Sequence, residues 1–285
     1  MHNLQEIYSN LVDKKLRGSL VTKENVIFNN SYEGTPTAGG TVKIPVRDTE
    51  VEVKEYDKSK GVNLSNSNTT YIDLKLNNDE AVNEIIDGYD ASAVPDGIVA
   101  ERIDSAGYSL GLAIDKKSIK ELEETEGVTI ATSKAKSTDA NAFKNALDAK
   151  TALSRTGVPN DGLRWLIASP EFTALLMLDD KFIKQGDLSQ ELVMQGAIGK
   201  IAGFVVYESN NTMFNNENFV EGKRVTTEFI CGHPNWCHRV EAWQVPVEIK
   251  NLTNNYIGSS AVQGRKVYGL KISKPETVYI KRIEA

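Results

Sequence analysis

The stretch that decides the fold is LRWLIASPEFTALLMLDDKFIKQGD, residues 163–187, followed at residues 196–210 by GAIGKIAGFVVYESN. Its short apolar run at 163–168 predicts a buried strand. Ser169-Pro170-Glu171 signals the start of a helix, with a serine N-cap, a proline in the first turn and a carboxylate near the positive end of the dipole. FVVYES, residues 204–209, predicts another strand, so the stretch combines strand, helix, loop, turn and strand.

The rest of the second half alternates in the same way. An amphipathic pattern predicts a helix over residues 139–156. Four further segments have strand character, at 225–232, 238–250, 265–272 and 277–283. No repeat period is present. The fold class expected from these patterns is α+β.

The first half contains more extended elements. Residues 3–16 carry an apolar stripe, which predicts a short helix that packs on its own core or on a neighbouring chain. Strand alternation over 41–56 and again over 69–77, around a polar tip, predicts a long hairpin. So long a hairpin with few large apolar residues is marginally stable alone. We infer that it packs on a partner chain, and a hairpin folded onto its own domain is the alternative.

Two helices are expected next. Residues 77–80 read as a cap for a helical stretch over 81–92. A long helix then follows Pro95 and runs over residues 96–126, on the order of 40 Å at 1.5 Å per residue. Gly127 ends it, as glycines commonly do at helix C-termini.

Composition excludes several classes of protein. The 285 residues carry a net charge of −6 with no basic block, which argues against a dedicated nucleic-acid binder. No apolar run approaches the roughly 20 residues of a membrane helix, and the first residues lack a signal-peptide core. Two cysteines give no disulfide framework, so synthesis and folding in a cytoplasm are expected.

The stretch ICGHPNWCHRVEAW, residues 230–243, is the strongest candidate for chemistry. Cys231, His233, Cys237 and His238 offer four soft ligands, so a zinc-dependent enzyme centred on 231–238 is one hypothesis. The C-x-H-x3-C-H spacing differs from usual zinc knuckles, and adjacent residues on a strand point to opposite faces. A Cys–His nucleophile pair has no supporting signature here. The favoured interpretation is structural: Cys231 is a small buried residue, His233-Pro234-Asn235 form a turn, and Trp236 and Trp243 are packing aromatics.

Other candidate motifs also read as structural. Gly196, Gly199 and Gly203, with Lys200, suggest a phosphate loop but lack the Walker A spacing, so a tight turn into the next strand is expected. The carboxylates at the end of the long helix are interpreted as a solvated face or an intersubunit charge patch; they are Glu121, Glu123, Glu124 and Glu126. A second acidic pair is interpreted as part of a loop and consists of Asp179 and Asp180. We expect no catalytic, cofactor-binding or metal-binding residues.

The order of elements resembles that of the major capsid protein of tailed bacteriophages, the Hong Kong 97-type capsid fold. In that family an apolar strand, a Pro-led helix and a glycine turn precede a strand ending near Ser or Asn. The positions that fill the turn and strand are Ile198, Gly203, Val205, Val206, Ser209 and Asn210. Two C-terminal segments also match, QVPVEIKNLTNNY at 244–256 and RKVYGLKISKPETVYIK at 265–281 with its Lys274-Pro275.

The resemblance implies a division of the chain into the family's parts. Residues 1–37 would be the N-terminal arm and 38–76 the extended hairpin, or E-loop. The peripheral domain would combine 77–126, including the spine helix at 96–126, with 246–267. The axial domain would combine 127–245 with 268–285.

The implied function is structural. The chain would be a non-enzymatic shell subunit that forms hexamers and pentamers around the double-stranded DNA of a phage. Its expected partners are other copies, scaffolding and portal proteins, and DNA through weak contacts. It would assemble in the bacterial host cytoplasm and reside in the virion capsid. An encapsulin-like compartment is the alternative on the same fold.

The sequence also departs from relatives. A long cleavable scaffolding segment is not seen, so we expect a separate scaffolding protein or a mature form. Lys54, Lys58 and Lys60 lie in the hairpin, but nothing marks one as reactive for cross-linking.

Overall fold

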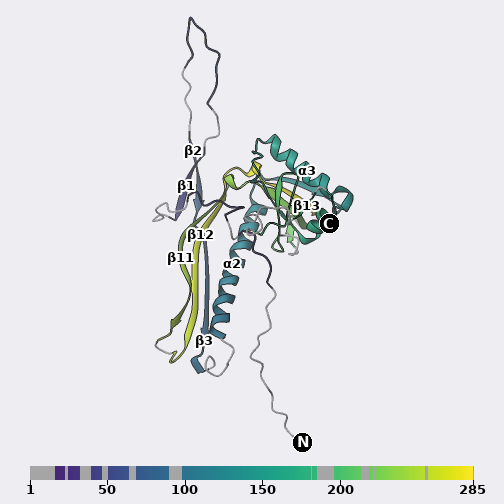
Figure 1. Ribbon diagram of the computed structural model, residues 1–285. Helices are drawn as coiled ribbons and strands as arrows, with labels where there is room; N and C mark the ends of the chain where they lie inside the picture. The colour runs from purple at the N-terminus through teal and green to yellow at the C-terminus, as the bar shows by residue number, and fades with distance from the viewer. Residues whose placement is uncertain are drawn as a thin grey trace.

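A computed structural model shows a rounded body with two elongated projections (Figure 1). The body holds the largest sheet, and the projections are a ladder of long strands and a hairpin at the opposite end of the molecule. The described residues are 17–22, 25–32, 40–46, 51–63, 69–89, 98–180, 182–184, 196–212, 218–220, 223–253 and 256–284.

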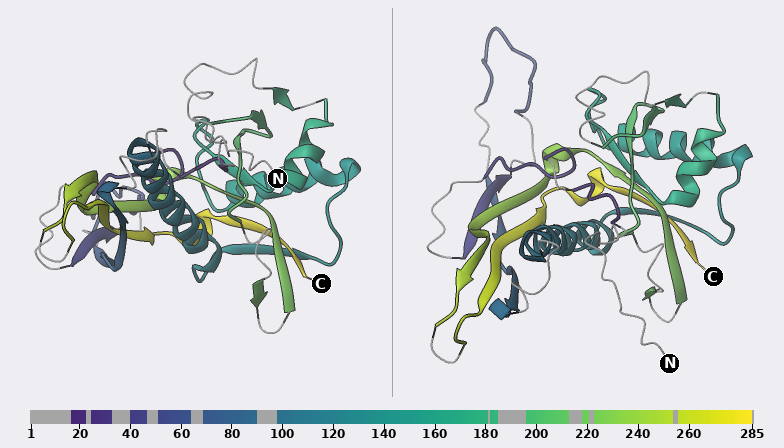
Figure 2. Two further views of the ribbon diagram at one scale, coloured as in Figure 1. Left: turned by 90° about the horizontal axis from the view of Figure 1, so that it is seen from below. Right: turned by 60° about the horizontal axis from the view of Figure 1, so that its bottom comes forward.

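The body is built on an eight-stranded mixed sheet with order β4-β13-β10-β5-β8-β7-β6, in which β9 pairs with β10. Helices α3 (Asp139–Arg155) and α4 (Pro170–Met177) pack against it (Figure 2). The strands are β4 (Thr129–Ser133), β5 (Trp165–Ala168), β6 (Ile183–Lys184), β7 (Gly199–Ile201), β8 (Phe204–Glu208), β9 (Asn218–Val220), β10 (Lys223–Gly232) and β13 (Tyr279–Glu284).

The first projection is an antiparallel ladder with order β11-β12-β3, formed by β11 (Cys237–Asn251), β12 (Ser260–Ile272) and β3 (Asn78–Ile86). Helix α2 (Ile98–Glu124) lies along it, and its buried apolar residues Leu110 and Ile114 join the core shared with the ladder. Gly127, with φ +88°, follows the helix. The long helix predicted over 96–126 is therefore confirmed.

The hairpin consists of β1 (Thr41–Val46) and β2 (Thr70–Lys75), paired from Thr41–Lys75 to Val46–Thr70. Alternate residues of its base are buried against Val240 of β11. Gly269 of β12 makes this packing possible, because a Cβ there would lie 2.6 Å from the carbonyl oxygen of Lys75. The base of the hairpin thus packs on its own chain, as in the alternative of a hairpin folded onto its own domain.

Residues 17–22 and 25–32 form a strap across the molecule. Val21, Ile27 and Phe28 are buried in the main core. Asn29 pairs with the start of β11, donating its N–H to the carbonyl of Cys237 and accepting from the N–H of Arg239 at 2.9 Å. The strap therefore joins the N-terminal region to both the helix and the ladder.

Sequence-predicted elements in the body agree closely with the structure. The 139–156 helix is α3, and the strand at 163–168 is β5. Ser169 is the N-cap of α4 and accepts a hydrogen bond from the N–H of Phe172 at 3.3 Å. The expected turn at His233-Pro234-Asn235 is a 3₁₀ helix over Pro234–Trp236, with His233 as its N-cap. The later strands correspond to β8, β10, β11, β12 and β13.

Two predictions in the first half are wrong. Residues 78–86, which include most of the expected cap at 77–80 and the first half of the helix expected over 81–92, form β3, because pairing with β12 outweighs the local helical pattern. Residues 51–56 are described without strand pairing, although their alternation predicted a strand, since no partner strand in the described part of the chain lies beside them. The helix predicted over 3–16 lies outside the described residues.

The residues that the structure describes include no helix long and apolar enough to span a membrane.

Candidate functional site

Both cysteines of the Cys/His stretch are fully buried in the body. Cys231 in β10 belongs to the core beneath α3 and α4, whereas Cys237 at the start of β11 belongs to the core beneath α2. Burial raises the pKa of the Cys237 thiol to about 12 and raises that of Cys231 still further. Thiols with raised pKa values are poor nucleophiles at neutral pH.

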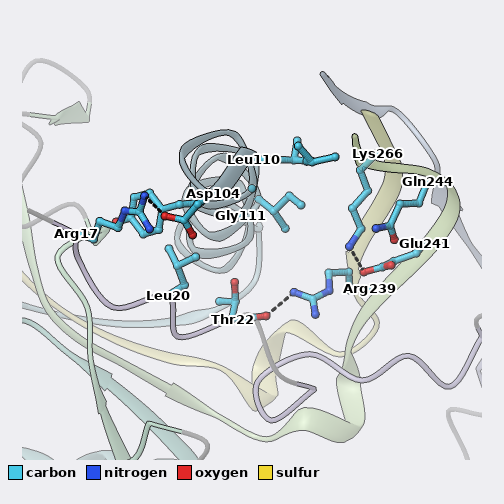
Figure 3. Close-up of a pocket in the computed structure, with 14 residues that line it drawn as sticks. Arg17, Leu20, Thr22, Asp104, Leu110, Gly111, Arg239, Glu241, Gln244 and Lys266 are labelled. Atoms are coloured by element: carbon cyan, nitrogen blue, oxygen red, sulfur yellow. Dashed lines mark hydrogen bonds and ion pairs between the residues drawn. The ribbon is translucent and has the colours of Figure 1, made fainter. Parts of the chain in front are cut away.

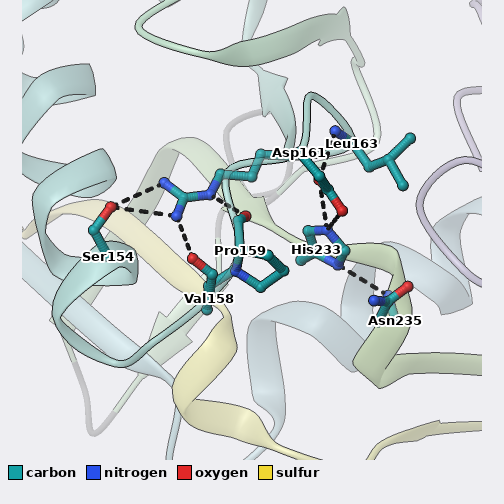
Figure 4. Close-up of polar contacts among 8 residues, drawn as sticks. Ser154, Val158, Pro159, Asp161, Leu163, His233 and Asn235 are labelled. Carbon is teal, nitrogen blue, oxygen red and sulfur yellow. Dashed lines mark hydrogen bonds and ion pairs between the residues drawn. The ribbon is translucent and has the colours of Figure 1, made fainter.

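His233 anchors a loop and lies beside polar partners rather than thiols. Its Nδ1 accepts from the N–H of Asn235 at 3.3 Å, and its Nε2 lies 3.1 Å from Oδ1 of Asp161 (Figure 4). With Nδ1 acting as an acceptor, Nε2 carries the proton and donates to Asp161. Asp161 has a lowered pKa, because hydrogen bonds from Leu163 and His233 to the carboxylate outweigh its desolvation.

His238 is held in a second polar cluster. Its Nδ1 lies 2.9 Å from Oδ1 of Asn29 and its Nε2 lies 3.1 Å from Oγ of Ser273. Desolvation by burial lowers its pKa to about 4, so the imidazole is neutral at physiological pH. Within the described residues, no three or more His, Cys, Asp or Glu side chains gather closely enough to hold a metal ion.

Arg164 holds the loop that carries Asp161 through hydrogen bonds. Its guanidinium donates to the carbonyls of Val158 and Pro159 and to Oγ of Ser154 (Figure 4). The side chain is almost fully buried, and desolvation lowers its pKa. These hydrogen bonds hold the backbone at Val158 and Pro159, while the side chains of Asp161 and His233 contact each other (Figure 4).

The glycine-rich stretch forms the predicted tight turn. β7 and β8 pair in antiparallel fashion, with Ile201 opposite Phe204. Between them, Ala202 has φ +49° and Gly203 has φ +89°. Such positive φ values suit a two-residue hairpin turn. Lys200 pairs across the strands with Val205, so its surroundings differ from those of a phosphate loop.

The carboxylates singled out by the sequence are dispersed. At the end of α2, Glu121 is half-buried and has a raised pKa through desolvation, while Glu124 lies 3.7 Å from Lys120. Glu123 is buried, and its backbone carbonyl accepts from Arg282. Glu126 is exposed. Asp179 and Asp180 follow α4, where the carbonyl of Asp179 accepts from the N–H of Phe182.

A groove of about 470 Å³ lies between α2, the strap and the ladder (Figure 3). Its floor includes Gly111, where a Cβ would lie 2.9 Å from Cδ1 of Leu20. Two ion pairs line it, Arg17 with Asp104 at 2.6 Å and Lys266 with Glu241, and the guanidinium of Arg239 donates to the carbonyl of Thr22.

Exposed apolar side chains concentrate instead on the two projections. The distal hairpin exposes Val51 by 79%, Val53 by 96% and Tyr56 by 73%. The far end of the ladder exposes Ile257 by 93%, with Ile85, Tyr89 and Tyr256 also exposed. These groups lie at opposite ends of the molecule (Figure 1). Contiguous exposed apolar groups commonly mark protein–protein contacts.

Sequence reasoning found the hairpin but missed the far end of the ladder. The segment around Tyr256 and Ile257 contains only a short apolar pair within a polar loop, and the pattern around Ile85, which pairs with Ala261, predicted a helix. Trp243, expected as a packing aromatic, is half exposed on the ladder, with the guanidinium of Arg265 5.3 Å from the centre of its ring. Trp236 does pack against the core of the body.

No protein-family model and no curated protein matches the sequence. The structure is similar to a solved structure from Mycobacterium phage Che8, with a TM-score of 0.74, 21% identity and coverage of 98% of this chain and 97% of that chain. It is also similar to a capsid structure of the cyanophage P-SCSP1u, with a TM-score of 0.75, 11% identity and coverage of 98% and 92%.

A third similar structure is that of a virus-like particle from Pyrococcus furiosus, with a TM-score of 0.50, 15% identity and coverage of 85% of this chain and 86% of that chain. The mature capsid of bacteriophage PhiM1 and a structure from Gordonia phage Cozz also match over nearly the whole chain. The chain therefore has the Hong Kong 97-type capsid fold, which is the fold expected from the sequence.

Proposed function

We propose that this protein is the major capsid subunit of a tailed phage, and that copies of it assemble as hexamers and pentamers into an icosahedral shell around double-stranded DNA. The observation that carries this proposal is the pair of projections with exposed apolar ends on a capsid fold. Exposure of 93% of Ile257 and 96% of Val53 to water does not stabilise the fold of a monomer. A shell subunit would bury both against its neighbours.

The mechanism is geometric. Each contact between subunits is small, but a closed symmetric shell repeats it many times, so weak contacts add to a strong assembly. The two projections extend to opposite ends of the molecule and reach further than the body itself (Figure 1). Contacts at both ends link each subunit to several neighbours.

The division of the chain follows the same proposal: arm 1–37, E-loop 38–76, peripheral domain 77–126 with 246–267, and axial domain 127–245 with 268–285. The boundary between 245 and 246 falls within β11, next to an irregularity that follows Val245. The boundary between 267 and 268 falls within β12, where Val267 pairs with Trp243. The two proposed domains thus share continuous strands. Such strands would transmit a movement of one domain to the other.

The proposed partners are other copies, a scaffolding protein, a portal protein and the enclosed DNA. A net charge of −6 supports only weak, non-specific contact with DNA, since phosphate binding relies on lysine and arginine clusters. We place assembly in the host cytoplasm and the final location in the virion capsid. A structural role without catalysis is consistent with the thiols of raised pKa and the internally bonded histidines.

An encapsulin-like compartment is the alternative function on the same fold, and the zinc enzyme is a remote third. The similarity to phage structures is closer and covers more of the chain than that to the virus-like particle, with TM-scores of 0.74 and 0.50. For the zinc enzyme, the separation of Cys231 and Cys237 into different cores is unfavourable.

Electron microscopy of the expressed protein, alone and with a co-expressed scaffolding protein, tests the proposal. Closed icosahedral particles containing nuclease-resistant DNA after production in an infected host would support it. Particles filled with an enzyme cargo would favour the compartment. A protein that stays monomeric under all these conditions contradicts both shell functions.

A further inference from the structure

We infer that residues 51–56 of one subunit add as an antiparallel strand to the outer edge of β11 in a second copy, with Glu52 opposite Lys250 and Lys54 opposite Glu248. The inference rests on the proposed shell function and names a contact that builds the shell. Two observations support it: residues 51–56 have a strand pattern but no paired strand among the described residues, and β11 is an edge strand of its sheet.

Residues 51–56 have the pattern of a strand but no partner. Val51 and Val53 alternate with Glu52 and Lys54, and the described residues place no other strand beside them. Nζ of Lys54 lies 3.1 Å from Oε2 of Glu52, which puts these two side chains on one face. The two valines therefore share the other face and are 79% and 96% exposed. Such a segment lacks only a neighbouring backbone with which to pair.

β11 offers an open edge. Within the described part of the chain it pairs with β12 on one side, and on the other side it forms only the bridge between His238 and Asn29 near its start. Pro246 lies within β11, and proline is tolerated in a strand at an edge or an irregularity. Towards the end of β11, Nζ of Lys250 lies 3.0 Å from Oε1 of Glu248. Ile249, between them, is 38% exposed.

The charges specify one register. In the proposed pairing each carboxylate faces an ammonium group, and Val53 faces Ile249. A shift by two residues in either direction places Glu52 opposite Glu248 or Lys54 opposite Lys250. A parallel arrangement that aligns the two charged pairs creates both of these repulsions. A shift by one residue turns the valines away from Ile249. Because side chains directly opposite lie about 4.5–5.5 Å apart, like charges there are destabilising.

The two strands cannot meet within one subunit. Residues 51–56 belong to the distal hairpin, whereas residues 248–251 lie at the far end of the ladder, and these are opposite ends of the molecule (Figure 1). The occupant of the edge is therefore a second copy of this chain. Charge complementarity along the two segments favours this partner over an unrelated strand.

Charge exchange tests the register without altering net charge. The hairpin variant combines Glu52→Lys with Lys54→Glu, and the ladder variant combines Glu248→Lys with Lys250→Glu. Each variant keeps its own internal ion pair but places like charges opposite the wild-type partner. Each is expected to raise the protein concentration needed for assembly by about tenfold, with the effect weakening at high salt. The combined variant is expected to assemble like the wild type.

Cysteine pairing provides an independent measurement. A subunit with Val53→Cys is mixed with one carrying Ile249→Cys, co-assembled and mildly oxidised. Covalent dimers that are reversed by reductant are expected, since directly opposite residues meet the distance requirement of a disulfide. Val51→Cys with Ile249→Cys, a shift of two residues, is the matched control and is expected to react less. The natural cysteines are buried and do not interfere.

Electron microscopy first establishes whether the wild-type protein forms shells. If it forms no shell, both the proposed function and this pairing are overturned. If shells form but the combined charge variant fails to recover, or the shifted cysteine pair reacts as well as the proposed one, the pairing is wrong while the shell function stands. Circular dichroism of each variant separates misfolding from loss of contact, and the cysteine test then decides the pairing.

Discussion

At the scale of single residues, the chain's soft and titratable side chains serve packing. Cys231 and Cys237 lie in different cores, and His233 and His238 each hold a loop through both ring nitrogens. Residue chemistry alone made this stretch look reactive. Burial decides otherwise, because a group removed from water favours its neutral form.

The native thiols are expected to resist modification. In the folded protein at pH 8, both cysteines should react with a disulfide reagent at least a hundredfold more slowly than in denaturant, because raised pKa values and full burial leave almost no accessible thiolate. Absorbance of the released reagent measures this. The denatured protein is the control for two reactive thiols, and fast reaction of the native protein would contradict the assigned burial.

His238 is expected to make stability fall in acid. Its pKa is lowered to about 4 in the folded protein against about 6.5 unfolded, so the unfolded chain binds the extra proton between these values. The contribution of neutral His238 is complete above pH 6.5 and is lost as pH falls towards 4. The loss should be on the order of 2–3 kcal/mol.

Urea unfolding of the wild type and of His238→Asn across this pH range measures the effect. The difference in unfolding free energy between the two proteins isolates His238, because all other titrating groups are shared. A difference that does not change with pH would show that the imidazole is accessible to protons in the folded state.

At the scale of elements, long-range pairing overrides local pattern in the first half of the chain. Residues 81–86 place apolar side chains at helical spacing, yet they form part of β3 because β12 provides a ladder from Ser260 to Tyr268. The resulting strand alternates, with Glu80, Val82, Glu84 and Ile86 on its less exposed face. In the body, strong local signals such as Ser169-Pro170 agree with the fold and are therefore read correctly.

The strap depends on a buried carboxylate of α2. Oδ1 of Asp115 accepts from both the N–H and the hydroxyl of Thr22 at 2.8 Å, and Oδ2 accepts from Nδ2 of Asn211. Asp115→Ala leaves these donors without their partner in a buried site. It should reduce the unfolding free energy by about 2–4 kcal/mol.

Asp104→Ala is the matched control on the same helix. Its carboxylate pairs with Arg17 at 2.6 Å, but its side chain is 66% exposed, so the expected loss is below about 1 kcal/mol. Urea denaturation of both variants gives the comparison. Equal losses would mean that the strap is not fixed through Asp115.

At the scale of the whole molecule, the apolar ends of the projections matter more to assembly than to folding. Ile257 is 93% exposed, so changing it removes almost no contact within the subunit. Buried core residues have the opposite property. The surface that a monomer leaves exposed is the part of the structure that a shell would use.

Ile257→Asp is expected to leave the subunit's unfolding free energy within about 0.5 kcal/mol of the wild type. It should nevertheless lower the yield of assembled particles at least tenfold, because a charge would be carried into an apolar contact. Sedimentation velocity measures the fraction assembled. Ile257→Val keeps the apolar surface and should assemble normally, whereas full assembly of Ile257→Asp would remove this end of the ladder from the proposed contacts.

The α+β class, the long helix and the elements of the body could be predicted from the sequence, since they depend on caps, turns and periodicities within short windows. The resemblance to a capsid fold followed from the order of these elements along the chain. Tertiary structure alone decided that residues 78–86 are a strand, that the hairpin base packs on Val240, and that the Cys/His stretch is divided between two cores. Each of these depends on groups more than a hundred residues apart in sequence, or on whether a neighbouring strand is present. Local patterns carry neither kind of information.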